Sequence, residues 1–399
     1  MKKLRGRKKN RKAIVACLAG VMFLFAISST MTGSLMPDIL EQYMLSNMQV
    51  GFIGAVQSIG SIVAMFLGTL FADRFPKLKT IVLFFTLYAF VLTSIGRAPV
   101  YPTLLILFLL LGMTSSYLNL LLSAFVSEEY GERRTTCLNL LHGLFSLGSL
   151  AGPVYAGILG GWGHTWNHSF TGIGIICAGM LLFLLVFALP FETVDRGGRG
   201  KRIFPWKLLR DRQFLLLTLF GTFFMCYQGG VGSWIAVYLQ KGLECSPACG
   251  SLALTLFWTG IMCGRFLQPL IGRWMNYEKW LSFSCAVSVP LYTTAFLMAD
   301  PRIIISALLI VGILLGAAYP LILAVACGMY TEISGTVTSL MSLIQSAAGI
   351  VSAAAIGWIM DRAGYRRGIL FIPVLLLCSV VFFFLFENCR KVEGQQENG

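Results

Sequence analysis

The sequence predicts an all-α membrane protein in which twelve transmembrane helices form two pseudo-symmetric halves of six helices each. Three observations support this fold class: the composition, the number of apolar segments and the position of one basic linker. Of the 399 residues, 57% are hydrophobic and 12% are charged, and the mean hydropathy is +0.78. A soluble domain has about 25% charged residues, so this composition indicates a multi-pass membrane protein.

Apolar segments that are long enough to cross a bilayer recur along the whole chain. A transmembrane helix needs about 20 mostly apolar residues. The twelve expected spans are 13–36, 48–72, 78–96, 101–126, 135–160, 170–190, 213–239, 250–272, 280–299, 302–328, 333–360 and 367–387. The first is longer than the apolar core of a secretory signal, so we expect it to be an uncleaved span.

The longest polar insert, FETVDRGGRGKRIFPWKLLRDRQ, follows the sixth span and divides the chain into two halves. This insert predicts the domain organisation. We expect a basic cytoplasmic N-terminus at 1–12, an N-terminal six-helix bundle at 13–190, a cytoplasmic linker at 191–212, a C-terminal six-helix bundle at 213–387 and a cytoplasmic tail at 388–399.

The basic residues are distributed unequally between the two sides of this topology. With the N-terminus inside, 24 of the 31 Lys and Arg fall on the inner side, six fall outside, and Arg265 lies within a span. This bias predicts cytoplasmic termini in the cell (plasma or inner) membrane and contact with an anionic inner leaflet. A nucleic-acid surface would need basic and aromatic residues together on a soluble face, so we expect no nucleic-acid partner.

Two loops carry a recurring pattern of glycines and charges. The stretch GTLFADRFPKLKT (68–80) follows span two, and GWIMDRAGYRR (357–367) follows span eleven. Both resemble the Gly-x3-Asp-Arg-x-Gly-x-Arg-Arg loop of the major facilitator superfamily. The resemblance implies nested inverted repeats and rocker-switch alternating access. The clean copy at 357–367 is predicted outside, where Asp361 and its arginines would tie down an outer turn.

Within that superfamily, the chain is most similar to the fucose-permease-like sugar transporters. LNLLHGLFSLGSLAGP (138–153) in span five and GAAYP (316–320) in span ten carry this likeness. The likeness implies a sugar or another small polar solute as substrate. The chain departs from the branch because SSTMTGS (28–34) and GMTSSYLNL (112–120) hold no carboxylate where those symporters have one. Coupling to a proton or cation is therefore an open question.

The resemblance also implies a gate on the inner side, formed by Asp73 and Arg74. A carboxylate at the end of span two would cap the start of span eleven, near Ser334 and Gly335, where the helix dipole is positive. That contact would hold the halves together on the inside. A solvated loop acid is the alternative interpretation.

Two ionisable side chains, His142 and Arg265, are expected at membrane depth. Such residues are costly in a bilayer and are therefore functional candidates. Together they would select an anionic or polyhydroxyl substrate, and His142 would be the proton carrier if transport is proton-coupled. Alternatively, His142 donates to a backbone carbonyl and Arg265 braces the two halves.

Polar and aromatic side chains in the spans complete the predicted substrate site. Such groups, with few charges among them, suit hydrogen bonding and stacking to a sugar-like ligand, although helix–helix hydrogen bonds are an equal alternative. The candidates beside His142 and Arg265 are Thr32, Gln57, Tyr117, Asn119, Asn139, Tyr227, Gln228, Trp234, Trp258, Tyr319 and Gln345, with Thr30, Ser34 and Tyr238 as further members.

The sequence also contains features of function classes other than a secondary carrier. Gly148-x3-Gly152-Pro153 partly resembles a motif of drug–proton antiporters, but its spacing favours close helix packing, as do Gly260-x3-Gly264 and Gly312-x3-Gly316. A drug or metabolite efflux antiporter remains the alternative, with a non-transporting receptor or a membrane enzyme as different classes. No catalytic, nucleotide or cofactor motif is present, so we expect a carrier with no cofactor and no metal. We expect this carrier to be a monomer.

Two short loops leave smaller alternatives open. Cys245 and Cys249 could form a disulfide, although their spacing is awkward for one. His164 and His168 could form a surface metal site.

Overall fold

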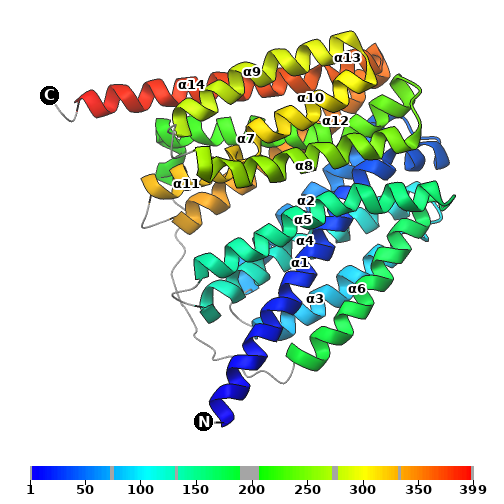
Figure 1. The fold of residues 1–399 in the computed structure, drawn as a ribbon, viewed down its shortest axis with the longest axis vertical. Coiled ribbons are helices and arrows are strands. Elements are labelled where there is room, and N and C mark those ends of the chain that lie inside the picture. Colours follow the sequence, from blue (N-terminus) through cyan, green and yellow to red (C-terminus); the bar gives the residue numbers. More distant parts are fainter. Residues whose placement is uncertain are drawn as a thin grey trace. The chain divides into compact units, whose positions relative to one another are not determined.

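The protein is seen in a computed structural model that describes residues 2–71, 76–130, 134–188, 206–271, 277–330 and 334–396. Within these ranges all regular structure is helical (Figure 1). Twelve of the helices are long and apolar enough to cross a membrane, so the predicted all-α, twelve-span fold is confirmed and the chain is a multi-pass membrane protein.

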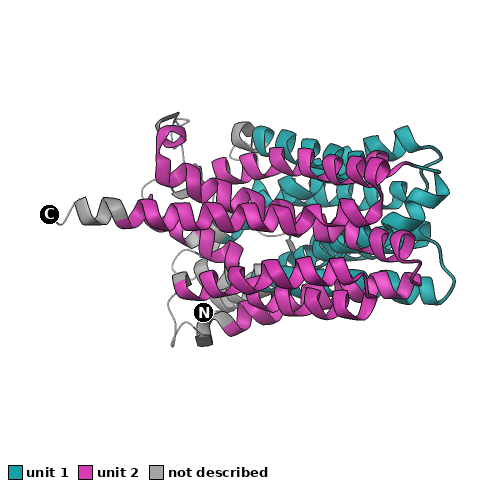
Figure 2. Cartoon of the chain, turned by 90° about the horizontal axis from the view of Figure 1, so that it is seen from above, with its two compact units in different colours: residues 1–45, 52–199 teal, residues 46–51, 200–399 magenta. Residues whose placement is uncertain are grey.

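Two compact units make up the chain (Figure 2). Unit 1 comprises residues 1–45 and 52–199, and unit 2 comprises residues 46–51 and 200–399. The first turn of the second helix thus groups with unit 2, which the sequence did not indicate. The predicted domain boundaries at 190 and 213 stay a prediction.

Unit 1 is built from six long helices. They are α1 (Lys2–Gln42), α2 (Asn47–Phe71), α3 (Lys77–Ile95), α4 (Tyr101–Tyr130), α5 (Arg134–Gly161) and α6 (Trp166–Ala188). Helices α1 and α5 meet at their backbones, because a Cβ on Gly148 would lie 2.3 Å from the Phe23 carbonyl oxygen and one on Gly152 would lie 2.6 Å from that of Ile27. This contact confirms the packing interpretation of the span-five glycines.

Unit 2 has more numerous and shorter elements. They are η2 (Trp206–Arg210), α7 (Arg212–Val237), the π-helical turn η3 (Tyr238–Gly242), α8 (Pro247–Ile271), α9 (Tyr277–Met298), α10 (Pro301–Leu315), α11 (Ala318–Met329), α12 (Ser334–Ala363), α13 (Tyr365–Ile369) and α14 (Phe371–Gln396). Its core is aromatic, with Phe214, Phe257, Tyr292 and Phe296 fully buried.

The tenth span differs from its prediction as one continuous helix over 302–328. It is interrupted at Gly316 and Ala317, between α10 and α11. Pro320 explains the interruption: it has no backbone N–H, so it cannot donate to the carbonyl of Gly316 four residues earlier. The sequence therefore leaves one carbonyl within this span without its intrahelical donor.

Helices α8 and α10 pack side by side through their glycines. A Cβ on Gly260 would lie 3.0 Å from the Cα of Gly312, and a Cβ on Gly264 would lie 2.2 Å from the carbonyl oxygen of Ile313. The predicted close approach of these spans is confirmed. It brings α8 within side-chain reach of the interruption between α10 and α11.

Candidate functional site

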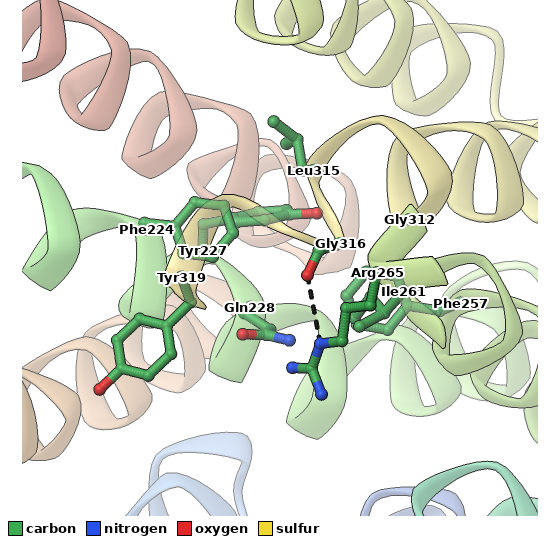
Figure 3. Close-up of a pocket in the computed structure, with 10 residues that line it drawn as sticks. All are labelled: Phe224, Tyr227, Gln228, Phe257, Ile261, Arg265, Gly312, Leu315, Gly316 and Tyr319. Carbon is green, nitrogen blue, oxygen red and sulfur yellow. Dashed lines mark hydrogen bonds between the residues drawn. The ribbon is translucent and has the colours of Figure 1, made fainter. Parts of the chain in front are cut away.

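A small pocket in unit 2 lies at the interruption between α10 and α11, between helices α7, α8 and α10 (Figure 3). Its cavity is about 10 Å³, about the space of one water molecule, within about 250 Å³ of non-atom space that includes its open mouth. Its lining residues are Phe224, Tyr227, Gln228, Phe257, Ile261, Arg265, Gly312, Leu315, Gly316 and Tyr319. The structure thus brings together four predicted site residues, Tyr227, Gln228, Arg265 and Tyr319.

Arg265 is positioned by the carbonyl that Pro320 leaves without an intrahelical donor. The Nε of Arg265 donates to the carbonyl oxygen of Gly316 at 3.3 Å. Gly316 ends α10, where the helix dipole presents partial negative charge, which favours a cation. The planar fork of the guanidinium suits carboxylates and other paired oxygens.

Gln228 and Tyr319 lie on the same side of the guanidinium and add polar groups there. Figure 3 shows the Gln228 amide beside the Arg265 guanidinium and the Tyr319 ring on the far side of that amide. The Tyr319 hydroxyl donates to Oε1 of Gln345 at 3.0 Å, which connects a fifth predicted residue to the pocket. Gln345 is 7% exposed, and its Nε2 is buried without a hydrogen-bond partner.

The remaining wall of the pocket is aromatic and aliphatic. Phe224, Tyr227 and Phe257 are buried, and the hydroxyl of Tyr227 lies 3.3 Å from that of Tyr292. This bond fixes the ring of Tyr227 and satisfies its hydroxyl inside the unit. The pocket therefore combines apolar faces with a few oriented polar groups, the usual character of a small-molecule site.

Two predicted residues of unit 2 lie apart from this lining. Trp234 is 1% exposed and lies against Gly357 of α12, since a Cβ on that glycine would be 2.9 Å from the indole ring. Trp258 packs edge-on against Phe257, with ring centroids 5.5 Å apart. Both indole N–H groups are buried without a hydrogen-bond partner. Their proposed role in binding stays a prediction.

The predicted residues of unit 1 make mostly intrahelical or packing contacts. The Thr32 hydroxyl donates to the Ser28 carbonyl at 2.8 Å, and Tyr117 stacks on Phe84 with centroids 4.3 Å apart. The carbonyl of Gln57 lies where a Cβ on Gly112 would be, so α2 and α4 are in close contact there. Asn119 keeps a buried Oδ1 without a partner.

Four predicted residues lie outside what the structure describes. The side chains of Asn139 and His142 belong to the described backbone of α5 but are themselves outside the described residues. Asp73 and Arg74, the predicted inner gate, fall in the undescribed segment 72–75. Their roles stay predictions.

The loop cysteines and histidines were considered as a disulfide and as a surface metal site. Cys245 and Cys249 are free thiols, so the alternative of a disulfide between them is wrong. The rings of His164 and His168 lie 5.1 Å apart, and Nδ1 of His168 is 2.9 Å from the Thr165 hydroxyl. The described ranges contain no cluster of three or more potential metal ligands.

Sequence reasoning missed part of this pocket. The Gly316 carbonyl, the aromatic wall of Phe224 and Phe257, and the hydroxyl contact of Tyr292 with Tyr227 were not predicted. Pro320 could have indicated the carbonyl, because a proline within an apolar span always leaves an acceptor four residues earlier. The aromatic residues carried no such signal, since the chain has 30 phenylalanines and most of the spans contain several.

The model of the Major Facilitator Superfamily matches residues 18–353 of the chain. The chain belongs to this superfamily. It is therefore a transporter and not an enzyme, and the resemblance noted in its loop motifs is confirmed.

Named relatives and solved structures agree with this membership. The glucose/mannose transporter GlcP of Bacillus subtilis (strain 168) is 22% identical over 86% of this chain and 88% of its own. The hexuronate transporter of the same strain is 24% identical over 83% and 84%. A bacterial homolog of the human lysosomal transporter Spinster, inward-facing and unoccupied, superposes with a TM-score of 0.79 at 16% identity, covering 95% and 97%.

Proposed function

We propose that this transporter carries a sugar or a sugar acid by rocker-switch alternating access, as a secondary carrier in the cell membrane. The observation that carries the proposal is the pocket of unit 2, where the Arg265 guanidinium and the Gln228 amide lie beside aromatic side chains, and where the Tyr319 hydroxyl bonds to the buried amide of Gln345 at the edge of the site. Relatives named as glucose/mannose and hexuronate transporters support this substrate class.

The chemistry of the pocket favours a ligand with several oxygens. A guanidinium, two amides and a phenol supply donors and acceptors for hydroxyl groups, and apolar ring faces pack against the C–H faces of a sugar. Arg265 adds a preference for a carboxylate, which it can bind with two parallel N–H groups. Thr32, Gln57, Tyr117 and Asn119 of unit 1 are proposed as further substrate contacts.

Substrate counterflow in proteoliposomes tests the proposal. Purified protein would be assayed with labelled glucose, mannose and glucuronate, and we expect saturable exchange of at least one of them. Arg265→Ala should lower transport about 10- to 100-fold, since a hydrogen bond to a charged group is worth about 1.5–3 kcal/mol. Arg302→Ala, at an exposed arginine of α10, is the matched control.

The outcome separates the two ligand classes. If Arg265 binds a carboxylate, the variant loses glucuronate exchange far more than glucose exchange. Equal loss of both indicates binding through hydroxyl groups. Unchanged exchange of every solute in Arg265→Ala, or no exchange by the wild-type protein, contradicts the proposed site.

Sidedness and coupling are part of the same proposal. Cytoplasmic termini follow from the distribution of basic residues, and labelling of the two termini from each side of the membrane tests them. Proton coupling through His142 predicts that uptake responds to an imposed pH gradient and that His142→Gln abolishes the response while exchange persists. Equal responses of both proteins exclude His142 as the carrier.

A further inference from the structure

A second cavity, apart from the pocket of unit 2, is a groove between helices α2, α3 and α4 of unit 1. Its volume is about 410 Å³, which lies in the range of ligand-binding pockets, about 300–1,000 Å³. The groove is therefore large enough for a bound molecule. The three helices contribute, in order, Ala64 and Leu67, Lys79 and Leu83, and Met113 and Tyr117.

The groove is closed at one end by a backbone contact between α2 and α4. A Cβ on Gly60 would lie 2.1 Å from the carbonyl oxygen of Leu109, so the two helices touch there. Ala64, one turn further along α2, is the first residue of that helix in the lining. On the facing side the ring of Tyr117 stacks on that of Phe84, with centroids 4.3 Å apart. The groove thus begins where α2 and α4 separate, and Lys79 lies towards its other end.

One wall of the groove continues as an exposed apolar stripe along α3. Leu83 is 56% exposed, and Leu87 and Phe90, one and two turns further along, are 42% and 68% exposed. Residues at this spacing share one face of a helix. Because α3 is a transmembrane span, a face of exposed apolar side chains suits the hydrocarbon of the bilayer. The groove and its stripe therefore form an apolar track on the lipid side of unit 1.

The length of this track corresponds to one leaflet. From Lys79 to Phe90 the helix rises roughly 16 Å at 1.5 Å per residue. The hydrocarbon core of a bilayer is about 30 Å thick, so one leaflet accounts for about half of that. An acyl chain that starts at the level of Lys79 would thus end near the middle of the membrane.

The charge at the start of the track is positive. Lys79 is exposed and is the charged side chain of the lining. It lies in the first turn of α3, which contains no acidic residue and begins after Pro76, a residue without a side-chain acceptor. The helix dipole adds partial positive charge at this end. An anionic group at Lys79 would therefore be favoured by the side chain and by the helix together.

We propose that this groove binds an anionic phospholipid of the inner leaflet, with the phosphate at Lys79 and one acyl chain between α2 and α4 and along α3. The predicted topology places the start of α3 on the inner side, where anionic lipids gather. The walls suit a chain better than a sugar, because they are mostly apolar and the Thr80 hydroxyl already donates to the Pro76 carbonyl at 3.1 Å.

Native mass spectrometry of the full-length protein in a neutral detergent tests the lipid site. The protein would be titrated with palmitoyl-oleoyl phosphatidylglycerol and, separately, with the phosphatidylcholine that has the same chains. We expect the first phosphatidylglycerol to bind at least fivefold more tightly than the first phosphatidylcholine. Lys79→Gln should weaken phosphatidylglycerol binding about fivefold, the usual contribution of one lysine near an anionic lipid surface, and leave phosphatidylcholine binding unchanged.

Matched variants separate this site from lipid that surrounds the protein in general. Lys279→Gln makes the same change at the third residue of α9, as Lys79 is the third residue of α3, and should leave both affinities unchanged. Leu83→Trp enlarges a side chain of the groove and should weaken binding of both lipids. Leu182→Trp, at a 65% exposed leucine of α6, is its control.

The headgroup without chains provides a further test. Glycerol 3-phosphate should not displace the bound phosphatidylglycerol, because it cannot occupy the groove. Displacement by glycerol 3-phosphate, together with unchanged lipid binding in Leu83→Trp, would show a site for a soluble anion and overturn the proposal.

Two other results also contradict the lipid site. Equal affinities of the wild-type protein for the two lipids would show that charge does not select the occupant. Equal effects of Lys79→Gln and Lys279→Gln would show that anionic lipid gathers around every basic span end. Each measurement is made without a transported solute, so its result is independent of the counterflow assay.

Discussion

Two charged side chains of unit 2, Arg265 in α8 and Asp361 in α12, both bond to backbone groups that a helix end leaves unpaired. Arg265 donates to the carbonyl of Gly316, which Pro320 cannot engage, at the C-terminal end of α10. Asp361 accepts from two N–H groups at the N-terminal end of α2. In each case the sign of the charge matches the end of the helix dipole that it meets.

The two sites differ in what holds the partners together. Helices α8 and α10 lie wholly within unit 2 and are in backbone contact through Gly264 and Gly312, so Arg265 and Gly316 have a fixed spacing. The partner of Asp361 is a single turn whose helix continues into unit 1. The first arrangement suits a rigid binding site, and the second caps a helix whose own segment supplies no side chain for these two N–H groups.

The largest effect is expected where the fixed spacing at Arg265 is broken. Gly264→Ala places a Cβ 2.2 Å from the Ile313 carbonyl oxygen, so α8 and α10 must separate. We expect about 1–3 kcal/mol lower stability, the usual cost of overpacking, and at least tenfold lower transport. Thermal unfolding and counterflow measure both.

The control for that variant is Gly229→Ala, where nothing lies within 4 Å of the new Cβ. It should keep wild-type stability and transport. If Gly264→Ala also behaves as wild type, the spacing of α8 and α10 does not hold the Arg265 site, and the first half of the comparison is wrong.

A smaller effect is expected when the Gly316 carbonyl is returned to its helix. Pro320→Ala adds a backbone N–H that can bond to this carbonyl, which then competes with Arg265. We expect KM for the transported solute to rise about threefold to tenfold with little change in kcat, because ground-state binding is what Arg265 would lose. Initial rates of counterflow over a range of concentrations provide both constants, and an unchanged KM would show that the carbonyl does not position Arg265.

The smallest expected effect is the coupling between the two sites. If Arg265 belongs to a fixed site and Asp361 to a separate helix cap, the effects of Pro320→Ala and Asp361→Asn on the free energy of unfolding should add in the double variant to within about 0.5 kcal/mol. Thermal or denaturant unfolding of the four proteins in the cycle measures this. A larger interaction energy would show that the two charges act as one network.

Much of the fold followed from local sequence. The twelve spans could be predicted because each stretch of about 20 apolar residues must form a helix to satisfy its backbone in a bilayer. The close packing of α8 and α10 through their glycine pairs could also be predicted from the sequence. So could the choice of Arg265 and Gln228 as candidate site residues. Trp234 shows what the sequence could not predict. It was named as a substrate contact because it lies near polar residues of its span, but in the structure its ring packs against Gly357.

Composition and hydropathy by themselves determined that the chain crosses the membrane, how often it does so and which ionisable residues lie within the spans. Only the tertiary structure decided what those residues contact. Pro320 indicates that the Gly316 carbonyl has no intrahelical donor. The bond from Arg265 to this carbonyl, however, requires α8 to lie beside α10. Asp361 and Asn47 are 314 residues apart, and no local rule connects them. Helix formation depends on neighbouring residues, whereas these pairings depend on which helices pack together.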